Sequence, residues 1–178
     1  AWTISIQGLN ETGTLVTDTI HTNATDGTLV GADVSAVTFM RLFRIKVTEC
    51  GQYAGPATPS HIASIVIEDT SGNTWATIDA TALARGQSQI GAYTVPLGHT
   101  AYLYDYLLTT EANKPIDFIM FQRGGILDVA VPYQARRTVI EEVGIQGYLP
   151  GSFKGGQKFD ELTDFGWLAL GGSAGDIV

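Results

Sequence analysis

The densest group of carboxylates in the chain lies in the segment KFDELTDF, which contains Asp160, Glu161 and Asp164. Glycoside hydrolysis uses a pair of carboxyl groups, one as the acid and the other as the base or nucleophile. No other part of the sequence supports that reaction. A charged loop with an aspartate at the start of the next strand accounts for the segment better, so we expect no hydrolase.

Histidine and cysteine are the next candidates, because both can bind metals. His21, His61 and His99 each lack the nearby histidine or carboxylate partner that local metal motifs contain. Cys50 is the only cysteine, so it cannot form a disulfide within the chain. A lone thiol is more often a small buried apolar group than a nucleophile. We therefore expect no metal and no cofactor.

Asp69, Ser71 and Asn73 form an oxygen-rich segment similar to a calcium-binding loop. The bidentate acid that should follow several positions later is absent, so a hairpin turn explains the segment better. No serine lies in a nucleophile-elbow pattern, and no glycine-rich loop suits a phosphate. Taken together, these patterns predict a protein that is not an enzyme.

Charge narrows the range of partners. The formal net charge is −8 and the isoelectric point is near 4.6. Nucleic-acid binding depends on cationic side chains that neutralise phosphates, and anionic membranes repel an acidic chain. No apolar run approaches the length that spans a bilayer. We therefore expect neither a nucleic acid nor a membrane as a partner.

The elements that would position these residues are predicted to be strands. Charged residues make up only 16% of the chain, and glycine, threonine and aromatic residues are frequent. About ten short alternating segments, separated by turn residues such as GLNETG and DTSGN, are typical of a sandwich. We predict an all-β, antiparallel two-sheet β-sandwich, jelly-roll-like, with long loops. It would form one domain over residues 1–178, with residues 23–35 as a loop or arm, and we expect a chain trimmed at either end.

Two strands are predicted to turn alternate residues toward the core. In TFMRLFRIKV, Phe43 and Ile45 have the same parity, and we expect both to be buried. In TAYLYDYLL, the same argument predicts that Leu103 and Leu107 lie between the sheets.

The turn before that second strand is predicted from Pro96 and Gly98, since proline ends a ladder and glycine permits the reversal. We expect this turn to pair the segment before it directly with the strand after it. Tyr102, Tyr104 and Tyr106 would then share the other face of the strand. A bulky amphipathic stripe of this kind is typical of an interface with a neighbouring subunit.

The segment GQSQIGAYTVPLGHTAYL, residues 86–103, resembles a β-sandwich virion structural protein of marine tailed bacteriophages. The segments TISIQGLN, TFMRLFRIKV and FDELTDFGWLAL are similar to flanking parts of that family. The resemblance implies a non-enzymatic protein that decorates or cements the capsid. It also implies copies assembled around a symmetry axis, for which we expect a homotrimer. Its partners would be the major capsid protein or other virion proteins, and its location the virion, assembled in the host bacterial cytoplasm.

Two alternatives from other classes remain open. A carbohydrate-binding or receptor-binding sandwich of a tail or fibre would expose Tyr102, Tyr104, Tyr106 or Trp167 as a platform. A strand-exchanging surface fibre subunit would instead bury residues 23–35 in its neighbour.

Overall fold

The structure is a computed structural model that describes residues 3–21, 34–49, 64–79, 86–88, 90–110, 114–127 and 135–171. Strands account for 67% of these residues and helices for none, so the predicted all-β, antiparallel class is confirmed. No helix among them has the length and apolar character needed to cross a membrane. The chain divides into two compact units, Ala1–Ile90 and Gly91–Val178, which are described separately below. The expectation of one domain stays a prediction.

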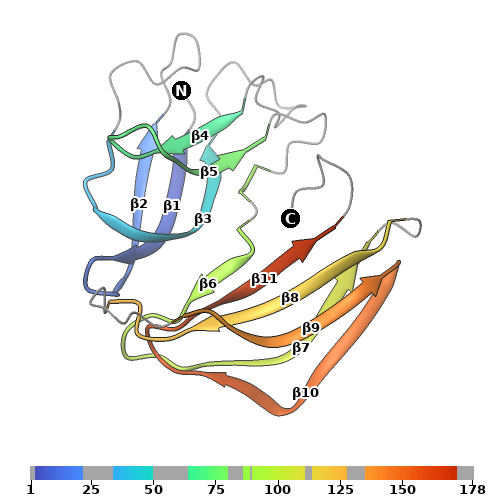
Figure 1. The fold of residues 1–178 in the computed structure, drawn as a ribbon. Helices are drawn as coiled ribbons and strands as arrows, with labels where there is room; N and C mark the ends of the chain where they lie inside the picture. Colours follow the sequence, from blue (N-terminus) through green and yellow to red (C-terminus); the bar gives the residue numbers. More distant parts are fainter. Residues whose placement is uncertain are drawn as a thin grey trace. The chain divides into compact units, whose positions relative to one another are not determined.

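Unit 1 contains a three-stranded antiparallel sheet, ordered β2-β1-β3, and the hairpin β4–β5 (Figure 1). Its strands are β1 (Thr3–Asn10), β2 (Leu15–His21), β3 (Phe39–Glu49), β4 (Ile65–Glu68) and β5 (Thr74–Ile78). Asn10 holds the turn between β1 and β2, because its side-chain oxygen accepts hydrogen bonds from the backbone N–H groups of Thr12 and Thr14. Asparagine favours turns for this reason.

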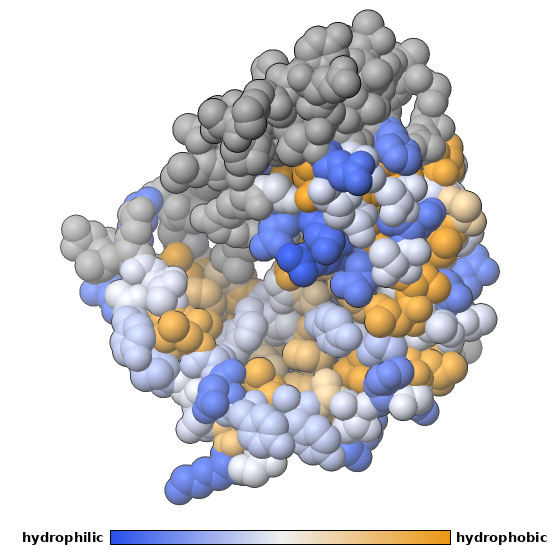
Figure 2. All heavy atoms as spheres, turned by 180° about the vertical axis from the view of Figure 1, so that it is seen from behind, coloured by the Kyte–Doolittle hydropathy of each residue, from blue (hydrophilic) through white to orange (hydrophobic). Residues whose placement is uncertain are grey.

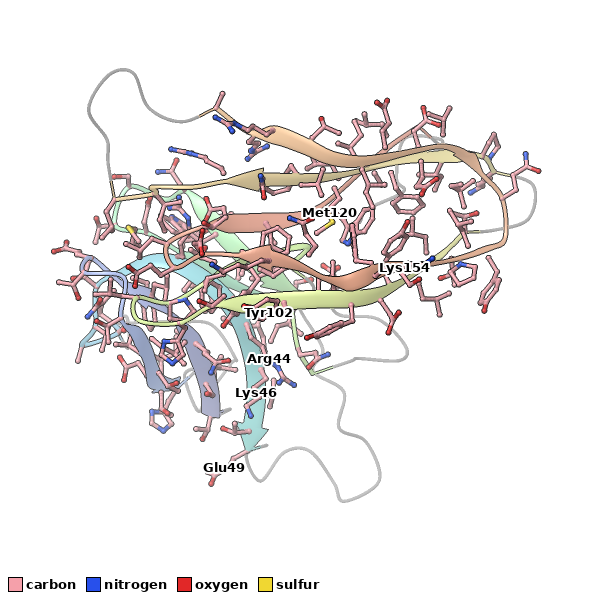
Figure 3. The ribbon with its side chains drawn as sticks, turned by 90° about the horizontal axis from the view of Figure 1, so that it is seen from below. Arg44, Lys46, Glu49, Tyr102, Met120 and Lys154 are labelled. Atoms are coloured by element: carbon pink, nitrogen blue, oxygen red, sulfur yellow. The ribbon has the colours of Figure 1, made fainter. Side chains whose placement is uncertain are left out.

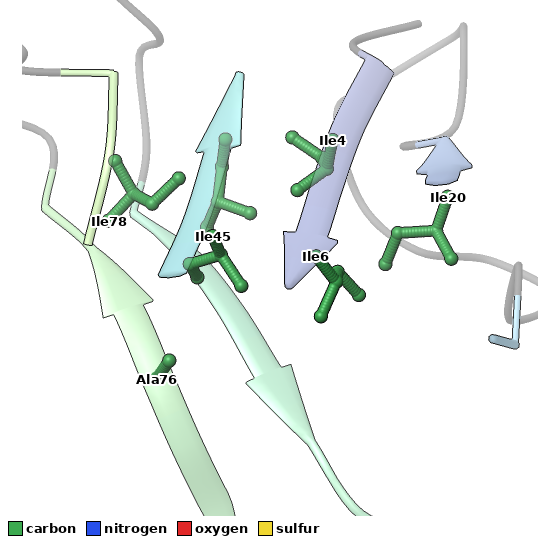
Figure 4. Packing of buried hydrophobic residues seen from close by; sticks show 7 residues of the cluster. Ile4, Ile6, Ile20, Ile45, Ala76 and Ile78 are labelled. Carbon is green, nitrogen blue, oxygen red and sulfur yellow. The ribbon is translucent and has the colours of Figure 1, made fainter. Parts of the chain in front are cut away.

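Isoleucines from all five strands form the core of unit 1 (Figure 4). The buried cluster consists of Ile4, Ile6, Ile20, Ile45, Ile65, Ala76 and Ile78. The β-branched side chains fit the pleated surfaces of the sheet and the hairpin that face each other. Ile45 is fully buried, so the prediction for this residue is confirmed.

Phe43 does not share the inward face with Ile45, and that prediction is wrong. A β-bulge interrupts the pairing of β1 with β3: Gln7 pairs with Arg44, but Gly8 pairs with Leu42. Phe43 is the extra residue, so the parity of β3 reverses there. Leu42 packs against the isoleucine cluster instead, and Phe43 is half-buried outside it.

Unit 2 is a two-layer antiparallel sandwich. One layer is a four-stranded sheet ordered β6-β11-β8-β9, and the other is the two-stranded ribbon β7–β10. The strands are β6 (Ala92–Thr94), β7 (Ala101–Thr109), β8 (Ile116–Arg123), β9 (Arg137–Ile145), β10 (Tyr148–Phe159) and β11 (Asp164–Leu170). Val95, Met120 and Phe159 are buried between the layers. The jelly-roll-like connectivity stays a prediction.

The turn predicted at Pro96 and Gly98 is present. The backbone N–H of His99 donates to the carbonyl oxygen of Pro96 at 3.1 Å, and Gly98 has φ of 77°. Glycine suits this position of a type II turn because a side chain would be strained there. The expected direct pairing across the turn is wrong, however. β6 pairs with β11 and β7 pairs with β10, so the turn carries the chain from one layer to the other.

A second break in register reorients β7. Asp105 pairs with Ser152 and Leu103 pairs with Gln157, which leaves four residues of β10 unpaired opposite one residue of β7. Leu103 packs against the core cluster on one side of this break, and Leu108 is buried on the other side. Leu107 is 58% exposed, so the prediction that it lies in the core is wrong.

Tyr106 faces inward for the same reason, and it does not share a face with Tyr102 and Tyr104. Its ring centroid lies 5.0 Å from that of Trp167 on β11, in the other layer. Its hydroxyl donates to Glu142 on β9 at 3.0 Å. Burial and this hydrogen bond both raise the pKa of Tyr106. Tyr106 therefore connects the two layers of unit 2.

We predict that Leu108→Ala destabilises the protein by about 2 to 5 kcal/mol, because it removes buried apolar surface and leaves a cavity. The matched control is Leu107→Ala, which should change stability by less than about 0.5 kcal/mol, because the side chain is exposed. Urea denaturation of both variants measures the difference. A larger loss for Leu107→Ala than for Leu108→Ala would contradict the observed orientation of β7.

Candidate functional site

The three carboxylates predicted as hydrolase candidates take part in contacts that hold turns and strands. Glu161 lies in the turn between β10 and β11. It accepts a hydrogen bond at 2.6 Å from the backbone N–H of Gly98, which lies in the turn between β6 and β7. Asp164 accepts one from the hydroxyl of Thr94 at 2.5 Å, between β11 and β6. Asp160 forms an ion pair that is described below. Their arrangement supports the turns and does not favour paired acid and base roles.

His21 and His99 are the histidines among the described residues, and neither belongs to a group that could hold a metal. His99 lies in the turn, with Nδ1 3.0 Å from the carbonyl oxygen of Leu97. Within the part of the chain that the structure describes, no three His, Cys, Asp or Glu side chains form a group that could hold a metal. His61 and Cys50 lie outside the described residues.

The oxygen-rich segment at Asp69 is a hairpin turn between β4 and β5. The carboxylate of Asp69 accepts hydrogen bonds from the backbone N–H groups of Ser71 and Asn73, at 2.8 and 2.9 Å. It also accepts them from the Asn73 amide at 2.8 Å and the Trp75 indole N–H at 3.2 Å. These bonds, with those from Asn73 largest, lower the pKa of Asp69 to about 2. The carboxylate is engaged by N–H donors, which supports the turn interpretation over a calcium loop.

We predict that the carboxyl group of Asp69 titrates near pH 2 in the folded protein, below its ordinary value of 3.8. Because the folded pKa is the lower one, its stabilising effect is complete above about pH 4 and is lost as the pH falls through 2. An NMR titration of the side-chain carboxyl carbon measures this, and Asp69→Asn should remove this part of the pH dependence. A midpoint at the ordinary value, or a downfield change on adding calcium at neutral pH, would contradict the assignment.

The outward side of the β7–β10 ribbon carries large apolar and aromatic side chains. We call it the tyrosine face, and it consists of Tyr102, Tyr104, Leu107, Tyr148 and Pro150. Tyr102 and Tyr104 are 52% and 56% exposed, and Tyr148 is 67% exposed. Leu107 pairs with Pro150, so both strands contribute to one surface. Figure 3 shows unit 2 from the side of this ribbon, with Tyr102 labelled on β7.

The two neighbouring tyrosines of this face are held by their surroundings. The rings of Tyr102 and Tyr104 lie 6.4 Å apart between centroids, with planes inclined by 25°. Gly156 is close to Tyr104, since a Cβ on this glycine would come within 3.0 Å of the ring. Lys158 pairs with Tyr102 across the ribbon. Rings that are already positioned lose less freedom when a partner binds.

A second feature is a cavity of about 240 Å³ where β8, β9 and β10 meet the turn between β10 and β11. We call it the polar pocket, and its lining residues are Gln122, Gly124, Ala135, Arg137, Gln157, Lys158, Phe159, Asp160 and Thr163. Phe159 and Thr163 are buried, at 1% and 8% exposure, and form its inner wall. The other side chains are more exposed and surround its mouth.

One ion pair lies in this lining. Lys158 Nζ is 2.7 Å from Asp160 Oδ1, and both side chains are exposed. The hydrogen bond to Asp160 and the negative charge of its carboxylate raise the pKa of Lys158. The lining contains two cations, Arg137 and Lys158, and one carboxylate, Asp160, so its formal charge is +1.

Comparisons with family models, with curated proteins and with solved structures find no match for this chain. A functional assignment therefore depends on the geometry of the tyrosine face and the polar pocket. The alternation along the chain predicts Tyr102 and Tyr104 as exposed residues, but it also predicts Tyr106, which packs inward, and it does not identify Tyr148. No local pattern marks the polar pocket, because its residues come from three separate segments, 122–124, 135–137 and 157–163.

Proposed function

We propose that the chain is a non-enzymatic structural subunit of a tailed-bacteriophage particle, which decorates or cements the capsid as a homo-oligomer. The observation that carries the assembly part of this proposal is the exposed tyrosine face on an ordered pair of strands. The resemblance of residues 86–103 to phage virion β-sandwich proteins supports the part of the proposal that places the chain in a phage particle. The subunit would join the virion in the host bacterial cytoplasm.

The composition of the tyrosine face favours a protein partner. Tyrosine is enriched at protein interfaces, where its ring buries apolar area and its hydroxyl still finds a hydrogen-bond partner. Exposed apolar residues alone are not unusual, and in the view of Figure 2 they are interspersed with hydrophilic ones. The tyrosine face differs because its members form two groups, Tyr102 with Tyr104 and Leu107 with Pro150 and Tyr148, which lie on either side of the exposed pair Asp105 and Ser152. Burying such a face yields about 25 cal/mol for each Å² of apolar area.

The net charge and the strand edges bear on how copies of the chain would contact one another. Copies with a net charge of −8 repel one another, so apolar contact must supply the attraction. The β7–β10 ribbon consists of two strands, so each strand has one edge outside this pairing. Contacts between unlike surfaces of identical subunits form a ring when the rotation between neighbours closes, and an open filament when it does not. We propose a trimer that contacts the major capsid protein or another virion protein.

We predict that Tyr104→Ser and Tyr148→Ser each weaken self-association by about tenfold or more, as expected for aromatic anchors of an interface. The control is Val143→Ser on β9, because Val143 is 68% exposed and lies outside the tyrosine face. Sedimentation velocity over a concentration series measures association, and thermal melts check that the variants fold. If all three variants self-associated as strongly as the unsubstituted protein, the tyrosine face would not be the interface between copies.

Quantitative mass spectrometry of purified virions, from the phage that encodes the chain, tests whether the chain is part of the particle. We expect a fixed ratio of this chain to the major capsid protein, because a decoration protein occupies repeated sites on the shell. Absence from the particle would refute the proposal, and a ratio of only a few copies per particle would place the chain in the tail or fibre.

A carbohydrate-binding or receptor-binding module of a tail or fibre is the second candidate. The specific observation in its favour is the exposure of Tyr102 and Tyr104, since exposed rings form platforms for sugars. Tyr106 and Trp167 do not add to such a platform, because they pack against each other. The strand-exchange alternative depends on residues 23–35, most of which lie outside the described residues.

A further inference from the structure

We propose that the polar pocket binds an acidic sugar, meaning one hydroxyl-rich ring that carries a carboxylate. The inference goes beyond the proposed assembly function, because the pocket does not include the tyrosines of the tyrosine face. It depends on the chemistry of the lining, the balance of charge and the size of the cavity.

The lining offers hydrogen bonds of both kinds. Gln122 and Gln157 carry amides that donate and accept, and the hydroxyl of Thr163 does the same. Asp160 adds a carboxylate acceptor, and Arg137 adds a guanidinium group with several donors. Sugar hydroxyls require this mixture, because each of them both donates and accepts. A lining with a single aromatic side chain, Phe159, does not suit an apolar ligand.

Charge favours an anion with a single negative charge. Lys158 is already paired with Asp160 at 2.7 Å. Among the described residues, the side chain of Arg137 has no hydrogen bond or ion pair, so its guanidinium remains available. Guanidinium binds a carboxylate through two parallel hydrogen bonds. A dianion such as a phosphate would meet the Asp160 carboxylate with only one excess positive charge to offset it.

The size of the cavity restricts the ligand to one ring. Sites for drug-sized molecules occupy roughly 300 to 1,000 Å³ and are mostly apolar. The polar pocket has a volume of about 240 Å³. A single pyranose held by its edge groups fits this description better than a longer chain held by stacking.

The test is an NMR titration of the ¹⁵N-labelled full chain with sodium glucuronate, and with glucose, acetate and phosphate in parallel. We expect glucuronate to shift the amide signals of Arg137, Gln157 and Thr163, at concentrations at least about tenfold below those needed for the other three probes. Equal binding of acetate or phosphate would reduce the pocket to a nonspecific anion site. If glucose bound as tightly as glucuronate, the carboxylate of the sugar would contribute nothing to binding. Either result, or no shift with glucuronate, would overturn the proposal.

Two neighbouring arginines provide a matched pair of variants. Arg137→Ala should weaken glucuronate binding by at least about tenfold, because it removes a charge-assisted hydrogen-bond pair. Arg136→Ala should leave binding unchanged, because Arg136 lies over the ring of Phe121 and does not line the pocket. A similar loss of glucuronate affinity in both variants would overturn the assignment of Arg137 as the residue that binds the carboxylate. Tyr104→Ser should bind glucuronate normally, so a failure of the assembly proposal can be distinguished from a failure of this one.

Discussion

The register break between β7 and β10 decides which side chains of unit 2 face the core. Four residues of β10 oppose one residue of β7, and Gly155 and Gly156 accommodate the excess with φ of 87° and 81°. Other residues would be strained in that conformation. Past the break, Tyr106 faces inward and packs on Trp167, while Leu107 faces outward. Gly151 makes room for this, because a Cβ there would overlap the Tyr106 ring.

The composition of the tyrosine face follows from that arrangement. A regular β7 would place Tyr106 among the exposed tyrosines and bury Leu107. The break instead exposes Leu107 opposite Pro150, so that the tyrosine face has a second apolar group at the Tyr148 end of the ribbon, beyond the exposed pair Asp105 and Ser152. At the other end of the ribbon, Lys158 and Phe159 lead into the turn that forms part of the polar pocket. An apolar surface for assembly and a small polar cavity therefore lie on the same two strands.

Much of the fold could be predicted because turn chemistry and alternation are local properties. Asn10 and Asp69 are turn residues, and each accepts several N–H hydrogen bonds in the structure. The errors have two physical sources. Bulges changed the parity of Phe43 and Leu107, and period-two alternation cannot reveal an extra residue, whether it lies in the strand itself, as in β3, or in its partner, as in β10. The turn at Gly98 was recognised, but the strands on either side pair with segments far along the chain. The polar pocket combines three segments that are separate in the sequence, so no local signal marks it.

The orientation of the three tyrosines of β7 is measured most directly by residue-resolved nitration with tetranitromethane. The protein concentration must be low enough to keep the protein monomeric. Tyr102 and Tyr104 should react rapidly, because they are 52% and 56% exposed. Tyr106 should react slowly, because it is packed between the layers and its pKa is raised by burial. In the assembled state, Tyr102 and Tyr104 should become protected as well. Nitration of Tyr106 at the same rate as Tyr104 in the folded monomer would contradict the reoriented strand and the tyrosine face defined by it.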